Sequence, residues 1–177
     1  MSTNLINNLR NKLEKGLRTT KYEINISNPA AGDMTDSTVL CKATSFPAKT
    51  IGQVEVWTQG HKAMLQGDTE FEHTWDVTFY ETESHSLRQA FIDWMDAIDN
   101  AVENTHENFT DGSASVMQLS STGNAKTAGY EFTNIWPQSV SSIELTDESV
   151  NTFGEFTVTF SFDYWVKDTS VSSTTSS

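Results

Sequence analysis

The chain has 177 residues, of which 36% are hydrophobic, so about 64 side chains are available for burial and one compact domain is expected. Eleven Lys and Arg against 24 Asp and Glu give a formal charge of −13, which argues against a basic groove that grips nucleic-acid phosphates. A single cysteine excludes an intrachain disulfide framework. Because the apolar runs are short and the N-terminus lacks a signal-peptide core, we expect a soluble protein made in the cytosol.

The N-terminal segment differs in charge from the rest of the chain. Residues 1–21 hold five basic residues and one acid, a net charge of +4, whereas residues 22–177 carry −17. Leu5, Ile6, Leu9 and Leu13 share one side of a 3.6-residue period, which predicts a short amphipathic helix over residues 3–15 that stops at Gly16. The charge difference favours an arm that docks on a neighbour's acidic surface, and a frayed terminus is the other interpretation.

Most of the following sequence alternates apolar and polar residues with the period of a β-strand. The expected strands are 22–26, 39–43, 51–57, 62–66, 74–79, 114–119, 130–136, 139–145 and 153–166. The last has the clearest pattern, with an apolar face made of Phe156, Val158, Phe160, Phe162 and Tyr164. A turn at Pro137 is expected to separate two of the strands.

One helix interrupts the strands. Leu87, Ala90, Phe91, Trp94, Met95 and Ile98 form an amphipathic stripe, and Ser84 or Ser86 can cap the helix. We expect this helix on the outside of the β body, with its stripe in the same core as the 156–164 face.

The chain therefore divides into three parts: a basic arm with a short helix (residues 1–20), a β domain (21–167) and a Ser/Thr-rich tail (168–177). The tail has almost no apolar area to offset its ordering entropy, so it is expected to be disordered.

No pattern of reactive side chains predicts an enzyme, a metal site or a cofactor. His61, His73, His85 and His106 lack the spacing of a metal site, and the acids form no calcium loop. Cys41 falls in an expected strand and is interpreted as a buried, inert thiol. Close pairs of carboxylates are interpreted as solvated surface.

Several segments, in unbroken order over about 125 residues, resemble one known family. They are Cys41 to Ala48 (CKATSFPA), Gly67-Asp68 with Phe71, Trp75 to Phe79 (WDVTF), Arg88 to Trp94 (RQAFIDW), Trp136 to Val140 (WPQSV) and Phe156 to Trp165 (FTVTFSFDYW). The chain is thereby similar to the tail tube proteins of contractile-tailed bacteriophages, whose fold is shared with the tube proteins of type VI secretion. Thr69, the enlarged turn at residues 28–37 and the Ser/Thr tail depart from the family pattern.

The resemblance implies a mainly β fold, a β-sandwich or small barrel with one flanking helix and a short N-terminal helix. It implies a structural, non-enzymatic virion protein, assembled in the host cytoplasm as hexameric rings that stack around a channel for DNA ejection. Implied partners are the sheath outside, DNA and the tape-measure protein inside, and baseplate and terminator proteins at the ends. The alternatives are a baseplate, initiator or secretion-type tube subunit, and a carbohydrate-binding β-sandwich that uses exposed aromatic residues.

Two sets of residues are candidate sites in such an assembly. The segment 45–66 is more apolar than a solvated connection needs, so we expect it to contact adjacent subunits or rings through Phe46, Pro47, Ile51, Val54 and Trp57. A channel that lets DNA pass must not bind phosphates, so we expect a net negative lining drawn from Glu55, Asp68, Glu70, Glu72 and Asp76.

Overall fold

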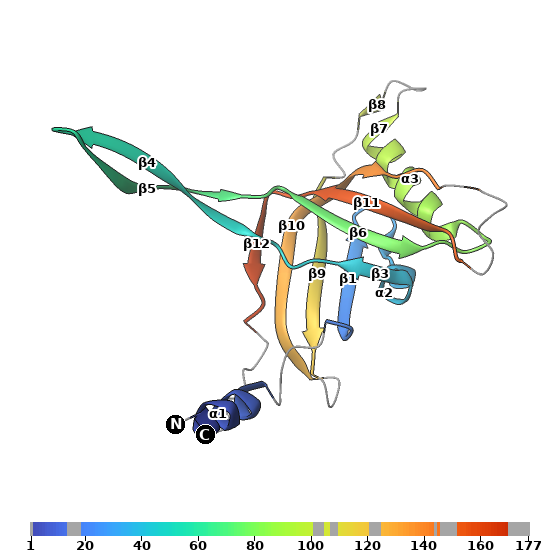
Figure 1. Ribbon diagram of the computed structural model, residues 1–177. Helices are drawn as coiled ribbons and strands as arrows, with labels where there is room; N and C mark the ends of the chain where they lie inside the picture. The colour runs from blue at the N-terminus through green and yellow to red at the C-terminus, as the bar shows by residue number, and fades with distance from the viewer. Residues whose placement is uncertain are drawn as a thin grey trace.

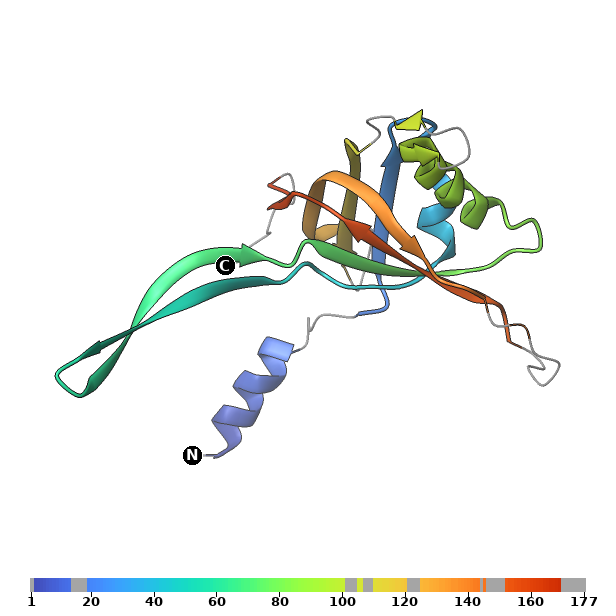
Figure 2. The same cartoon turned by 90° about the horizontal axis from the view of Figure 1, so that it is seen from above.

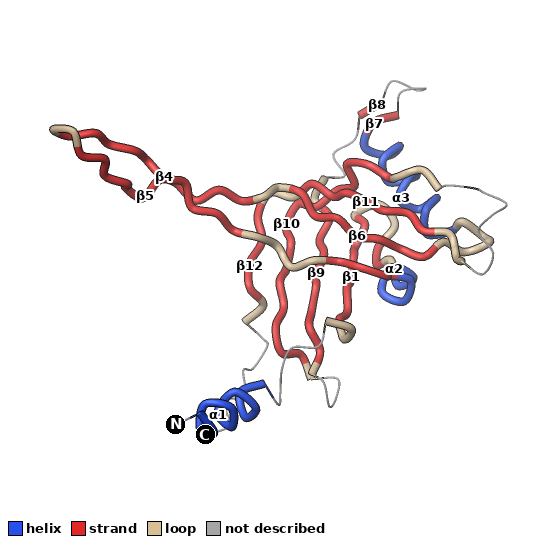
Figure 3. The backbone as a smooth tube through the Cα atoms, viewed as in Figure 1, coloured by secondary structure: helices blue, strands red, loops and turns tan. Residues whose placement is uncertain are grey.

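The computed structural model describes residues 2–13, 19–100, 105–106, 110–120, 125–143, 145 and 152–169. Within these ranges the helices are α1 (Ser2–Leu13), α2 (Thr35–Leu40) and α3 (Ser86–Ile98). The strands are β1 (Tyr22–Asn28), β2 (Gly32–Asp33), β3 (Cys41–Thr44), β4 (Lys49–Thr58), β5 (His61–Phe71), β6 (Thr74–Tyr80), β7 (Asp99–Asn100), β8 (Thr105–His106), β9 (Gly112–Leu119), β10 (Lys126–Val140), β11 (Glu155–Ser161) and β12 (Tyr164–Lys167). Figure 3 shows how strands dominate the trace.

One antiparallel sheet makes the body, in the strand order β2-β1-β9-β10-β11-β6-β3, with β12 beside β10. Strand β10 belongs to two layers, because residues 126–135 pair with β9 whereas residues 136–140 pair with β11. Register shifts on either side of Ile135, together with the left-handed φ of 54° at Asn134, mark the bend. Strands β1 and β9 consequently run across β6 and β11 (Figures 1 and 2). The predicted mainly β class is confirmed.

The core lies between these layers and beneath α3. Phe160 on β11 is fully buried and its ring is 5.6 Å from those of both Trp75 and Phe91. Phe79 on β6 lies 5.4 Å from Phe91 on α3. The helix therefore packs its apolar stripe inward, as predicted, and shares one core with the strand face. The main buried apolar residues are Ile24, Ile26, Trp75, Val77, Phe79, Leu87, Phe91, Trp94, Val116, Phe132, Ile135, Phe156, Val158, Phe160 and Phe162.

The strand expected over 39–43 is wrong at its start, because α2 continues to Leu40 and β3 begins at Cys41. Two hydroxyl groups hold the helical turn: the Ser37 hydroxyl donates to the Met34 carbonyl within the turn (2.6 Å), and the Thr38 hydroxyl donates to the Ile24 carbonyl of β1 (2.6 Å). Val39 is 83% exposed, so its place in the alternation does not reflect burial.

Two further predictions of strand boundaries are wrong, both where the sheet bends from one layer to the other. The expected strand 130–136 continues through Pro137 to Val140 as one strand, β10, in which Pro137 sits beside a bulge and needs no donor. The separate strand expected over 139–145 is wrong, because only Ser139 and Val140 belong to β10 and residues 141–143 and 145 lie outside any strand. The expected strand 153–166 is divided into β11 and β12, because the chain leaves β6 after Ser161 and pairs with the first half of β10. Tyr164 is consequently 47% exposed, outside the core in which it was expected.

The helix termini also differ from expectation. Helix α3 follows His85, which has a left-handed φ of 51°, and no side chain caps it. Ser84 donates its hydroxyl hydrogen to Ser86 (3.2 Å), so the two expected caps bond each other. Helix α1 confirms the predicted N-terminal helix as far as Leu13, whereas its expected end at Gly16 lies outside the described residues, as do residues 170–177 of the expected disordered tail.

Candidate assembly surface

Strands β4 and β5 form a long two-stranded hairpin that projects away from the body (Figures 1 and 2). Its tip is a two-residue turn in which Gln59 and Gly60 both have positive φ, 48° and 80°. Such a turn matches the right-handed twist of a hairpin and favours glycine at its second position. Six large apolar side chains of the hairpin are exposed by 39% to 66%, so the described part of the chain leaves them largely open to solvent; they are Ile51, Val54, Val56, Trp57, Met64 and Leu65.

The register assigns these side chains to two faces. Val54 pairs with Leu65 and Val56 pairs with Ala63, which places the four on one face, called here the apolar patch. The other face is mixed: Trp57 pairs with Lys62, whose ammonium lies 5.8 Å from the centre of the indole and forms an ion pair with Glu55. One side of the hairpin therefore resembles an uncovered core and the other resembles the rim of an interface.

The base of the hairpin is fixed to the body through the segment before β4. The Trp75 indole donates to the Ser45 carbonyl (3.0 Å), and the Phe46 ring lies 5.0 Å from that of Tyr130. On β3, Lys42 forms an ion pair with Glu155 of β11 at 2.5 Å, which holds the ammonium charged and raises the pKa of Lys42. The hairpin is thus an arm on a rigid base.

The structure separates the five predicted contact residues into two groups. Ile51, Val54 and Trp57 lie exposed on the hairpin, Val54 on the face opposite the other two. Phe46 is 37% exposed and packs on Tyr130, and Pro47 is half-buried, so these two belong to the base. Met64 and Leu65 are equally exposed on the hairpin and were not among the predicted residues, although they belong to a short apolar run, Ala63 to Leu65, in the expected strand 62–66.

The five candidate channel acids come from the hairpin, from the segment after it and from β6. Glu55 lies on the mixed face of the hairpin, and its charge is paired with Lys62. Asp68 lies on β5, at the irregular pairing opposite the stretch from Ile51 to Gln53 of β4. Glu72 is exposed between β5 and β6, and Asp76 is on the solvent face of β6, where it accepts a hydrogen bond from Thr159 (2.6 Å). Glu70 pairs through its backbone with Thr50 near the base.

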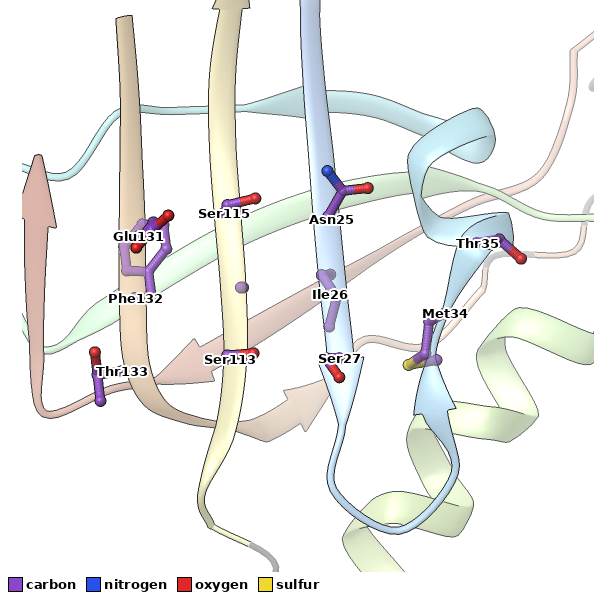
Figure 4. Close-up of a pocket in the computed structure, with 11 residues that line it drawn as sticks. Asn25, Ile26, Ser27, Met34, Thr35, Ser113, Ser115, Glu131, Phe132 and Thr133 are labelled. Atoms are coloured by element: carbon purple, nitrogen blue, oxygen red, sulfur yellow. The ribbon is translucent and has the colours of Figure 1, made fainter. Parts of the chain in front are cut away.

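A shallow groove of about 430 Å³ crosses the solvent face of β1, β9 and β10 (Figure 4). Its lining is dominated by small polar side chains, among them Asn25, Ser27, Ser113, Ser115 and Thr133. A sugar site needs exposed aromatic rings, but the aromatic residue in this lining, Phe132, is only 1% exposed. This groove therefore gives no support to the carbohydrate-binding alternative.

The histidines and the cysteine are dispersed. His73 contacts the Phe162 carbonyl (3.1 Å) and His85 contacts Glu81 (3.3 Å), while His61 is at the hairpin tip. Among the described residues no three His, Cys, Asp or Glu side chains gather as a metal site, and no described helix could cross a bilayer. Burial raises the pKa of the half-buried Cys41 thiol to about 11, which keeps it protonated at neutral pH.

The chain matches known proteins over most of its length. The family model described as phage tail tube protein matches residues 11–168. The tail tube protein gp19 of Enterobacteria phage T4 is 31% identical over 131 residues, which cover 72% of this chain and 80% of that protein.

Solved structures share the fold at low sequence identity. A chain of the anti-feeding prophage baseplate has a TM-score of 0.62 at 10% identity, covering 83% of this chain and 91% of that one. A chain of the sheath–tube complex of the PVC extracellular contractile injection system has a TM-score of 0.58 at 12% identity, covering 88% and 93%. The chain therefore belongs to the tail tube proteins of contractile-tailed bacteriophages, and it is a structural subunit of such a tube.

Proposed function

We propose that copies of this chain close into hexameric rings, which stack into a tube around a channel. The exposed hairpin is the observation that supports this assembly most directly, because six large apolar side chains are open to solvent on a ribbon with two unpaired edges. Such surface is tolerated in a soluble subunit when a partner covers it. A neighbouring copy is the partner that a homopolymeric tube supplies.

The proposal includes the partners of a contractile tail. The sheath would contact the outer wall, as in the sheath–tube complex whose tube has this fold. Baseplate and terminator proteins would bind the ends, and DNA and the tape-measure protein would pass through the channel. The role is structural and non-enzymatic, assembly takes place in the host cytoplasm, and the division into residues 1–20, 21–167 and 168–177 remains a prediction.

We also propose that the channel lining is net negative. Around Asp76 the solvent face of β6 and β11 consists of Thr74, Thr78, Thr157, Thr159 and Ser161. Small hydroxyl side chains with a carboxylate give a smooth wall that repels phosphates. Because Lys62 neutralises Glu55, we expect Asp68, Glu70, Glu72 and Asp76 to contribute more charge than Glu55.

Electron microscopy of the purified chain tests the assembly. Six-fold rings or long tubes are expected, and a chain that stays monomeric at every protein and salt concentration tried would refute the proposal. A reconstruction of the tube then tests the channel, since a wall of net positive charge would overturn the predicted lining while leaving the assembly intact.

Trp57 separates the contact from the fold. Trp57→Ala is expected to reduce tube formation at a given protein concentration, because the indole is 66% exposed in the subunit and is expected to be buried between subunits. The melting temperature of the monomer should stay unchanged. Thr58→Ala, next in the strand, is the matched control, and normal tubes from Trp57→Ala would remove Trp57 from the interface.

A further inference from the structure

Helix α1 carries a second uncovered apolar surface. Ile6, Leu9 and Leu13 are exposed by 49%, 56% and 62%, and their spacing puts them on one side of the helix. Figures 1 and 2 show α1 apart from the β body and from the hairpin. A helix of twelve residues with such a stripe is marginal in water unless it packs on something.

The apolar patch and the helix stripe match in size. The patch is a block of two residues on each strand, about 7 Å along the strands and 5 Å across, before the width of the side chains is added. The stripe from Ile6 to Leu13 is about 10 Å long. One face of α1 is thus long enough to cover the four side chains of the patch.

Their charges are also compatible. Helix α1 has no acid in its first turn and carries Arg10 and Lys12 in its last turn. At 100° per residue these two flank the apolar stripe on opposite sides, so their stems can extend the apolar contact while their heads stay solvated. Asp68 lies three residues beyond Leu65 along β5, and the chain as a whole carries −13. A basic helix is therefore drawn to the hairpin rather than repelled.

We propose that α1 of one subunit packs on the apolar patch, Val54, Val56, Ala63 and Leu65, of a second copy. Both surfaces are exposed within the folded chain, so the contact joins two copies. The inference rests on the proposed self-assembly and names the occupant of one hairpin face. The mixed face with Trp57 remains open to a different neighbour.

Cysteine cross-linking between two separately made variants tests the contact. In a Cys41→Ser background, which removes the single native thiol, Leu9→Cys protein is mixed with Val56→Cys protein, assembled and mildly oxidised. A disulfide joining the two chains is expected at least tenfold faster than for two control mixtures. One control replaces Leu9→Cys with Asn8→Cys, on the polar side of α1, and the other replaces Val56→Cys with Gln53→Cys, on the mixed face. Mass spectrometry of the linked peptides identifies the pair.

An assembly measurement distinguishes this contact from the tube itself. Leu9→Gln is expected to raise the protein concentration needed for tube formation about tenfold, and Asn8→Gln to leave it unchanged. Tubes that form from Leu9→Gln at the wild-type concentration, together with equal cross-linking rates in all mixtures, would overturn the α1 contact and leave the proposed function standing. A Leu9→Cys, Val56→Cys double variant that forms an intrachain disulfide when dilute would overturn the assignment to a second copy. Failure of the unaltered chain to form rings or tubes would overturn both proposals.

Discussion

Truncation of Phe160 provides the sharpest test of the core. Phe160 has no exposed surface and its ring touches those of Trp75 on β6 and Phe91 on α3, so Phe160→Ala opens a cavity where both layers and the helix meet. Removal of a buried Phe side chain costs about 3 to 5 kcal/mol, to which two aromatic pairs contribute. The whole free energy of unfolding of such a domain is about 5 to 15 kcal/mol. Phe160→Ala is therefore expected to remove a large part of the free energy of unfolding.

Urea denaturation of the monomer measures this effect, at protein concentrations where light scattering detects no assembly, because association would add stability. In thermal unfolding of the same monomer, the melting temperature should fall by about 6 to 20 °C, given about 2 to 4 °C for each kcal/mol in a domain of this size. Ser161→Ala, on the solvent side of the same strand, should change stability by less than about 0.5 kcal/mol. An unchanged urea midpoint for Phe160→Ala would refute the placement of the Phe160 side chain in the core against Trp75 and Phe91.

Two other predictions concern steric fit and pH. Gly112→Ala should destabilise the monomer by about 1 to 3 kcal/mol in the same urea assay, since the added methyl group would lie 2.4 Å from the Ile135 carbonyl oxygen. Gly154→Ala is the control, because its methyl group would lie 3.5 Å from the nearest atom, on Glu81. Equal urea midpoints for the two variants would contradict the close packing of Gly112 on Ile135. Burial raises the pKa of Cys41 to about 11 and that of Tyr22 to about 12, so the stability they contribute is fully present below pH 9 and is lost as the pH rises through these values. Urea denaturation midpoints measured between pH 8 and 11 check this, and the midpoint of Cys41→Ala should decline less over that range. Alkylation of Cys41 at pH 8 should be about 100-fold slower than that of a free thiol.

The elements that sequence reasoning predicted best are those whose pattern is decided by burial against the core. Phe156, Val158 and Phe160 alternate because β11 has one wet face, and the stripe on α3 repeats because the helix covers that same core. Their periods are local consequences of which side is buried, so they can be read along the chain.

The missed features depend on partners that the local pattern does not contain. Pro137 is typical of a break, but a bulge at the bend of the sheet accommodates it, and the bend also divides 153–166 into two strands. Val39 fits the alternation of apolar and polar residues expected of a strand. It nevertheless lies in helix α2, where the hydroxyls of Ser37 and Thr38 donate to backbone carbonyls. The cross-strand partners in the hairpin depended on one extra residue in β5, between Gln66 and Thr69, which the local pattern of β4 does not contain.

Charge and apolar surface act in opposite directions in this subunit. A formal charge of −13 makes copies repel one another, which keeps an exposed apolar hairpin soluble before assembly. The same repulsion opposes the closed ring, and it is screened beyond about 8 Å at physiological salt, so only short-range contacts can hold the copies together. In the proposed assembly the hairpin would supply apolar contacts at that range, and α1 would bring the positive charge of Arg10 and Lys12 to the neighbouring copy. The buried aromatic core stabilises the subunit, whereas in the proposed tube the exposed arms would hold the copies together, so changes in one need not alter the other.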